Sequence, residues 1–253
     1  KFKTSVIAGV IFLIHPITVE SVVWVSSLRT SLTALFAFLF ILYYLQNKYK
    51  IKIIIVIFFV LSILTNPISG GVLFILPIAW ILLAKKDGGD KKEGLVDSFF
   101  LVIFLLVFFY LHSQKVVSSQ YFGFFSFFDR FKIVNISLFN YISNFLFPVG
   151  LEFSYQISPD KISRLDGGGL VLPILGSILF FSIPYLKFLK LNYRVILFFQ
   201  LLFVAFLIPN LGFFLHDFNN LSVVADRYAY LSLLPFSLLI SIIIIRFTIN
   251  SIF

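Results

Sequence analysis

Residues 228–247 read YAYLSLLPFSLLISIIIIRF, and Arg246 is the one charged side chain in this apolar run. A helix needs about 20 predominantly apolar residues to cross the hydrocarbon layer of a bilayer. The run therefore predicts a membrane-spanning helix. Similar runs predict further helices over about 3–14, 28–46, 51–66, 69–84, 97–113, 168–187 and 194–212. The helices over 51–66 and 69–84 are short, so they form either two thin spans or one re-entrant hairpin.

The composition of the whole chain supports an all-α integral membrane protein. Of its 253 residues, 60% are hydrophobic and only 12% are charged, so we expect a single transmembrane domain over residues 1–253 with about eight spans. The chain has no cysteine, which excludes disulfides, thiolate chemistry and cysteine-based metal sites. The net charge of +9 is typical of basic cytoplasmic loops, and we expect no nucleic-acid partner.

Residues 131–147 form a ninth run, but it carries polar side chains on one helical face from Ser137 onward. This pattern predicts an amphipathic helix that lies flat at the membrane surface. With that helix flat, most basic residues fall on one side, the cytoplasmic side by the positive-inside rule. The opposite, outer loops cover about 15–29, 113–167 and 213–227. All three histidines, with His112 at the outer end of the run over 97–113, and most acidic residues fall on this outer side. This distribution is typical of an enzyme working at the outer surface, whereas a transporter has its site near the midplane.

Residues 15–29 read HPITVESVVWVSSLR and place ionisable side chains between two apolar runs. Such residues are costly at a membrane, so they are a functional-site hypothesis. If a short helix runs from Pro16 to about Leu28, Glu20 and Trp24 share a face. A carboxylate beside an indole can accept a proton from a hydroxyl. Alternatively, Glu20 keeps an interfacial helix in register and Trp24 anchors it among the headgroups.

The two ends of this segment also have alternative interpretations. His15 can bind a phosphate or a carboxylate, or it can cap the preceding helix. Arg29 can pair with a phosphate through its planar guanidinium, or extend its charge to the headgroups.

A second group of ionisable residues precedes and opens the run over 228–247. An aspartate such as Asp226 is an ordinary residue at a helix start, and Tyr228 is an ordinary interface residue. Arg227 is harder to explain, because a guanidinium gains nothing from the dipole at a helix N-terminus. An anionic partner would explain it. His216 and Asp217 lie shortly before, in the same outer loop.

Residues 147–155 read FPVGLEFSY and lie between the two groups. Their aromatic and acidic side chains suit an acceptor groove, and they equally suit an ordinary solvent loop. The chain has no GxGxxG, Walker loop, HExxH or nucleophile elbow. Nucleotide binding, zinc proteolysis and serine hydrolysis are therefore without support.

Three segments resemble, in the same order, the motifs of one family. Residues 15–29 resemble the HPxxxExVxW…R segment of GT-C class multi-spanning glycosyltransferases, specifically the transmembrane O-mannosyltransferase-like proteins often followed by tetratricopeptide repeats. Residues 147–155 resemble the FPxGLxxxY loop of that family. Residues 209–212 and 225–231 resemble its P-x-x-G…ADRYxYLP ending.

The chain also departs from the family pattern. Asn66-Pro67 stands where a Lys-Glu pair is usual, and Ser232 stands where a proline is usual. No tetratricopeptide repeats lie within the chain. The absence of methionine indicates that Lys1 is not the natural start. In the family pattern the first span and the acidic catalytic loop would lie before Lys1, so the resemblance implies a fragment that lacks both.

The resemblance implies a GT-C-like bundle that moves mannose or another hexose from a polyprenyl-phosphate carrier to a hydroxyl of a protein or glycan. It implies catalytic carboxylates at Glu20 and Asp226, with Glu20 either the base or the group that orients it. It also implies donor-phosphate binding by Arg227, His15 and Arg29. The side chains expected to line the site are Trp24, His216, Asp217, Tyr228 and Tyr155. No cofactor beyond the lipid-linked donor is implied, no metal ligand is named, and a divalent metal stays open.

The composition, rich in phenylalanine, isoleucine and lysine, is typical of an AT-rich bacterial gene. We therefore expect the bacterial inner membrane, with the site facing the periplasm or exterior, or the endoplasmic reticulum in a eukaryote. Two alternatives remain for the function. One is a catalytically silent relative that serves as a structural subunit of a larger membrane complex. The other, a flippase of the carrier lipid, would need ionisable residues at mid-membrane.

Overall fold

The apolar run near the end of the chain forms helix α11 (Asp226–Asn250). In the computed structural model, residues 2–46, 53–66, 82, 106, 125–186, 192–212 and 221–250 are described. Over these ranges the chain forms helices and no strands, which confirms the all-α prediction. The other helices are α1 (Phe2–Ile14), α2 (Val19–Val23), α3 (Leu28–Gln46), α4 (Ile53–Thr65), α7 (Phe127–Leu146), α8 (Pro159–Ser163), α9 (Gly168–Ser182) and α10 (Tyr193–Leu207).

Four stretches of helix in the described ranges are long and apolar enough to cross a membrane: Val25–Gln46, Gly168–Tyr185, Tyr193–Asn210 and Asp226–Thr248. A fifth is added if Phe2–Ile14 and Pro16–Val23, which meet at 54°, form one span. Helix α4 is apolar but shorter. These helices support a membrane protein. The helices predicted over 69–84 and 97–113 lie outside the described residues, apart from the single positions 82 and 106.

Helix α7 begins at Phe127, four residues before the predicted start. The reason is a capping box. The Ser126 hydroxyl accepts the backbone N–H of Asp129, and the Asp129 carboxylate accepts the backbone N–H of Ser126. This reciprocal pair satisfies donors that a helix start otherwise leaves without partners.

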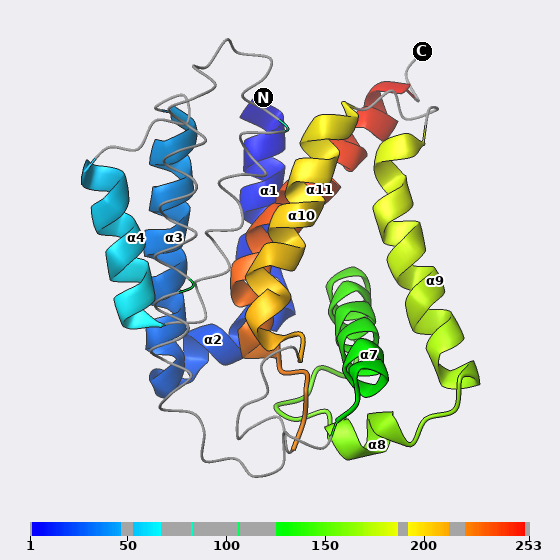
Figure 1. Cartoon of the computed structure of the whole chain (residues 1–253). Coiled ribbons are helices and arrows are strands. Elements are labelled where there is room, and N and C mark those ends of the chain that lie inside the picture. Colours follow the sequence, from blue (N-terminus) through cyan, green and yellow to red (C-terminus); the bar gives the residue numbers. More distant parts are fainter. Residues whose placement is uncertain are drawn as a thin grey trace.

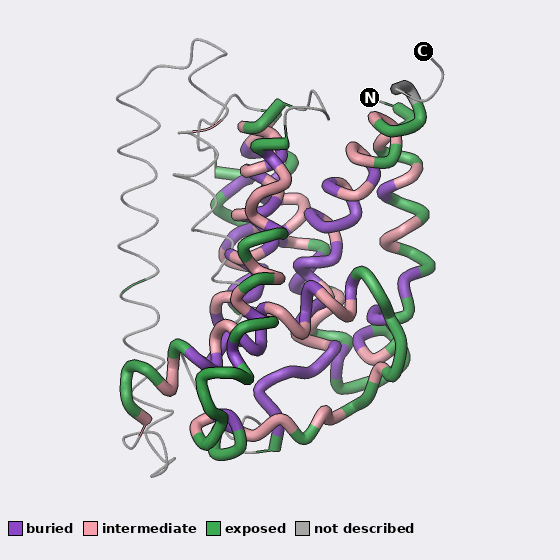
Figure 2. Tube along the Cα trace, turned by 90° about the vertical axis from the view of Figure 1, so that its right-hand side faces the viewer, coloured by how far each residue is buried: buried purple, intermediate pink, exposed green. Residues whose placement is uncertain are grey.

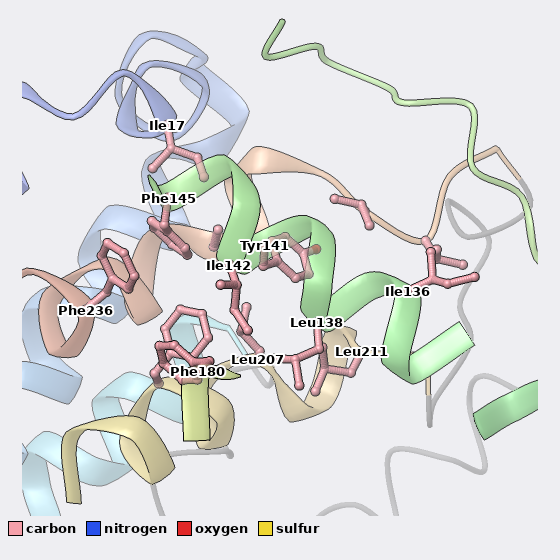
Figure 3. Close-up of a cluster of buried hydrophobic side chains, with 14 of the residues drawn as sticks. Ile17, Ile136, Leu138, Tyr141, Ile142, Phe145, Phe180, Leu207, Leu211 and Phe236 are labelled. Carbon is pink, nitrogen blue, oxygen red and sulfur yellow. The ribbon is translucent and has the colours of Figure 1, made fainter. Parts of the chain in front are cut away.

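The polar face of α7 points into the protein. In the sequence analysis, this polar face served to predict a helix that lies flat at the membrane surface, and that use is corrected here. Ser137 and Tyr141 are fully buried. The Tyr141 hydroxyl accepts the backbone N–H of Ala225 at 3.3 Å. Figure 3 shows Tyr141 beside Ile142 and Phe145 on α7, and these side chains belong to the main apolar core with Phe236 of α11. The amphipathic pattern therefore reflects internal hydrogen bonds as well as apolar packing.

The helices place three connections at one end of the bundle. In Figure 1, α2, α8 and the chain that leads into α11 lie at this end, whereas the N- and C-termini lie at the other. Figure 2 shows buried positions on the inner faces and exposed positions along the outer ones. The outer face of α9 is apolar and suits contact with lipid tails; its exposed side chains are Val171, Leu172, Leu175, Ile178 and Leu179.

Candidate functional site

Three segments that are far apart in the sequence meet at the end of the bundle that holds α2 and α8. They are α2 with its flanking turns, the connection from α7 to α8, and the start of α11. Direct side-chain contacts join them: Glu20 to Arg227, Trp24 to Phe153, and Tyr155 to Asp226. These are the segments that carry the three family-like motifs.

Arg227 holds Glu20 through two hydrogen bonds. Its guanidinium Nη1 donates to Glu20 Oε1 at 2.5 Å, and its backbone N–H donates to Oε2 at 2.9 Å. Each side chain is only 12% exposed. The first turn of a helix has backbone N–H groups without intrahelical partners. Glu20 therefore neutralises the Arg227 guanidinium and also caps α11 from a distant part of the chain.

This pair changes the interpretation of both residues. The sequence suggested an anionic partner for Arg227, and the chain itself supplies one in Glu20. Both Glu20 carboxylate oxygens accept hydrogen bonds from Arg227. The geometry thus favours an orienting role for Glu20 over proton transfer.

Aromatic rings surround the Arg227 guanidinium. Its central carbon lies 5.5 Å from the Trp24 ring centroid, 5.3 Å from that of Phe153 and 4.8 Å from that of Tyr228. The Trp24 and Phe153 rings meet edge to face at 5.3 Å. A cation within about 6 Å of a ring face is attracted by the ring quadrupole. Trp24 and Tyr228 therefore both contact the Arg227 guanidinium.

The helix considered from Pro16 to about Leu28 is interrupted at Trp24. Trp24 has an extended backbone, with φ −81° and ψ 114°, and it separates α2 from a short turn over Val25–Ser27. The β-branched valines around Trp24 lower the helix propensity of this segment. The break directs the indole toward Phe153 and Arg227.

Asp226 accepts a hydrogen bond from Tyr155. The Tyr155 hydroxyl donates to Asp226 Oδ1 at 2.7 Å, and the Asn144 amide donates to the same hydroxyl at 3.0 Å. Asp226 is 5% exposed. Burial, and next the bond to Asp226, raise the pKa of Tyr155 well above its ordinary value. The phenol therefore stays protonated and donates at any physiological pH.

His15 caps the turn that follows it. Nδ1 accepts the backbone N–H of Ile17 at 3.2 Å, so Nε2 carries the proton and donates to the carbonyl of Phe145 at 3.1 Å. The residue is buried. Both ring nitrogens are occupied, which favours the capping role over phosphate binding, and the capped element is the following turn rather than the preceding helix.

Arg29 is exposed in the first turn of α3, and α3 packs against both α2 and α11, the helices that carry Glu20 and Arg227. His216 and Asp217 lie outside the described residues. Across the described ranges, no group of three or more His, Asp or Glu side chains is arranged to hold a metal ion.

Sequence reasoning missed two residues of the site, Asn144 and Phe153. Asn144 belongs to the polar face of the run over 131–147, which was assigned to the membrane surface. Phe153 belongs to the aromatic loop over 147–155, but nothing in the local pattern distinguishes it from Phe147. Their contacts with the other site residues form only when α7 and this loop pack against α11.

Comparison of the chain with protein-family models, with curated proteins and with solved structures finds no match. The resemblance to GT-C glycosyltransferases is thus a hypothesis carried by the three motif segments alone.

Proposed function

We propose that the protein is a membrane glycosyltransferase that moves a hexose from a polyprenyl-phosphate carrier to a hydroxyl acceptor. The observation that carries the proposal is the convergence of the three segments, which brings Glu20, Tyr155, Asp226 and Arg227 together. The site lies at one end of a bundle of apolar helices (Figure 1). A carrier with a lipid tail and a phosphate head needs this kind of location, because its reacting carbon stays at the membrane surface.

Asp226 is the proposed proton acceptor. In a single displacement, the acceptor oxygen forms a bond to the anomeric carbon while the bond from that carbon to the phosphate oxygen breaks. The bonding electron pair leaves with the phosphate, and the hydroxyl proton passes to the Asp226 carboxylate. The configuration at the anomeric carbon of the sugar is therefore inverted. Glu20 orients Arg227, and the two together fix the start of α11, on which Asp226 lies.

Arg29 is the proposed donor-phosphate ligand. A guanidinium pairs well with phosphate oxygens through parallel hydrogen bonds. Arg227 already has a counter-charge in Glu20, whereas Arg29 is exposed at the start of α3. A cation in this position stabilises the charge that develops on the leaving phosphate.

A second candidate is a structural subunit of a larger membrane complex. It is favoured by the mutual pairing of Glu20 with Arg227 and of Tyr155 with Asp226, because a satisfied polar network also rigidifies a purely structural junction. This candidate predicts that site variants leave glycans unchanged and disturb copurification of partner proteins.

The test supplies labelled polyprenyl-phosphate mannose or glucose to membranes that contain the protein. Wild type is compared with Arg29→Gln and with a matched control, Arg164→Gln, which changes an exposed arginine outside the site. The proposal predicts transfer by wild type and by the control. It predicts a KM for the donor that is about tenfold higher in Arg29→Gln, as expected for the loss of a charged hydrogen bond. If wild type transfers no carrier sugar, the structural-subunit candidate replaces the proposal.

A further inference from the structure

Asn144 lies two hydrogen bonds from the proposed proton acceptor, Asp226, with Tyr155 between them. It is in the last turn of α7, and its Nδ2 donates to the Tyr155 hydroxyl at 3.0 Å. That hydroxyl in turn donates to Asp226 Oδ1 at 2.7 Å. A chain of three side chains, from α7, the following loop and α11, therefore ends on Asp226.

The numbers of donors and acceptors on the three side chains allow this series of hydrogen bonds to run in one direction only, from Asn144 through Tyr155 to Asp226. An ionised carboxylate only accepts, and a phenol has a single proton to donate. Tyr155 uses this proton on Asp226, so its oxygen is left as an acceptor. The amide of Asn144 supplies the donor that the Tyr155 oxygen then takes.

The other asparagines of α7 do not have this role. Asn140 Nδ2 donates to the Ile136 carbonyl at 2.8 Å, and Asn135 Nδ2 donates to the Phe131 carbonyl at 2.9 Å. Both of these bonds lie within α7 itself. Asn144 differs because its hydrogen bond leaves the helix and reaches Tyr155, a loop residue of the site.

We infer that Asn144 is a positioning residue, which acts through Tyr155 and keeps the Tyr155 proton directed at Asp226. This inference rests on the proposed function, since it assigns a purpose to a hydrogen bond behind the proposed proton acceptor. Without the amide, the phenol can rotate its proton toward other acceptors, and Asp226 loses a fixed hydrogen bond. The rate of proton acceptance then falls, while the binding of the donor, which depends on Arg29, stays the same.

Several charged or titratable groups lie close enough to influence Tyr155 and Asp226 electrostatically, and they have to stay unchanged in any test. They are Glu20, Arg227 and Tyr141 around Asp226, and Glu152 near Tyr155.

Replacement of Asn144 by leucine keeps the approximate size of the side chain and adds no charge. Asn140→Leu makes the same chemical change on the same helix, four residues away, and is the matched control.

The experiment is a double-mutant cycle with two readouts, on the whole protein in membranes and after detergent extraction. The variants are Asn144→Leu, Tyr155→Phe and the combination of the two. The first readout is kcat and KM for sugar transfer. We expect Asn144→Leu to lower kcat about tenfold with KM unchanged, which is a part of the roughly 10²–10⁴-fold that general acid–base catalysis contributes as a whole. Asn144→Leu should lower kcat no further in the Tyr155→Phe background.

The second readout is the thermal midpoint, which is independent of activity. Asn144→Leu should lower it in the wild-type background and much less in the Tyr155→Phe background. Additive effects on the midpoint would overturn the hydrogen-bond chain. A coupled midpoint with unchanged kcat, or an equal loss of kcat in Asn140→Leu, would overturn the positioning role. Inactive wild-type protein would overturn the proposed function, and with it the role in transfer, even if the midpoints were coupled.

Discussion

Glu20 and Arg227 are 207 residues apart in the sequence, and in the structure Arg227 donates to both oxygens of the Glu20 carboxylate. The ion pair joins α2 to the first turn of α11, and Ser21 extends the junction by donating to the Arg227 carbonyl at 3.5 Å. The pair thus couples the first motif segment to the third. Loss of the ion pair should therefore lower the stability of the protein, apart from any effect on catalysis.

Glu20→Gln should lower the free energy of unfolding by about 2 kcal/mol, because it leaves a guanidinium that is largely withdrawn from water without its counter-charge. The measurement is thermal or denaturant unfolding in detergent. Arg227→Met should also destabilise the protein. The double variant should be less destabilised than the sum of the two, with a coupling energy of about 1–3 kcal/mol. Strictly additive effects would show that the pair does not stabilise the fold.

Lys132→Met should destabilise the contact between α7 and the end of α8. The Lys132 ammonium is buried and donates to the carbonyls of Ser163 and Leu165, at 2.9 and 3.0 Å. Loss of these charged hydrogen bonds should cost about 2 kcal/mol. The control is Lys161→Met, an exposed lysine that donates to the Gln156 carbonyl at 3.1 Å. Equal unfolding energies for the two variants would contradict this assignment.

Gly176→Ala should destabilise the protein, although alanine favours helices by about 1 kcal/mol over glycine. A Cβ at Gly176 would lie 2.5 Å from two ring carbons of Phe139, so α9 or the ring has to move away from α7. Gly168→Ala, in the same helix, meets nothing within 4 Å and is the control. Phe139→Leu in the Gly176→Ala background should restore stability. Stabilisation by Gly176→Ala alone would refute the close packing of α7 on α9.

Acid should weaken the start of α7. The Ser126 hydroxyl, as a hydrogen-bond donor, lowers the pKa of Asp129 below its usual value. A carboxyl group with a lowered pKa in the folded state contributes stability above its unfolded pKa of about 3.9, and this contribution is lost as the pH falls through the folded value. The Asp129→Asn variant should therefore be less stable than wild type near neutral pH, and the difference should shrink in acid. Thermal midpoints across this pH range provide the check, and a constant difference would contradict the capping role.

The long helices could be predicted because apolar runs of membrane length have few alternatives. The predicted bounds 28–46 agree with α3, and α9 begins at the predicted residue 168. Helix α11 begins at Asp226 rather than at residue 228. The apolar pattern excludes Asp226 and Arg227, but Glu20 and Tyr155 satisfy their polar groups, so the helix extends through them.

The pairing of the site residues could not be predicted, because it depends on contacts between distant segments. The sequence identified Glu20, Asp226 and Arg227 as unusual. It predicted a substrate hydroxyl as the partner of Glu20 and a bound anion as the partner of Arg227, rather than a pair between the two side chains. It also directed the polar face of α7 outward, since a local pattern shows that a helix has two faces but not which face meets the protein. Asn144 was missed for this reason.

The most direct measurement of the central claim compares sugar transfer by wild type, Asp226→Asn and the exposed control Asp160→Asn in membranes at equal protein levels. Labelled polyprenyl-phosphate hexose is the donor, and the readouts are labelled product and released polyprenyl phosphate. We predict transfer by wild type and by Asp160→Asn, and a loss of at least about 100-fold in Asp226→Asn, as expected when a general base is removed. Undiminished transfer by Asp226→Asn, or no transfer by wild type from any carrier sugar, would contradict the central claim.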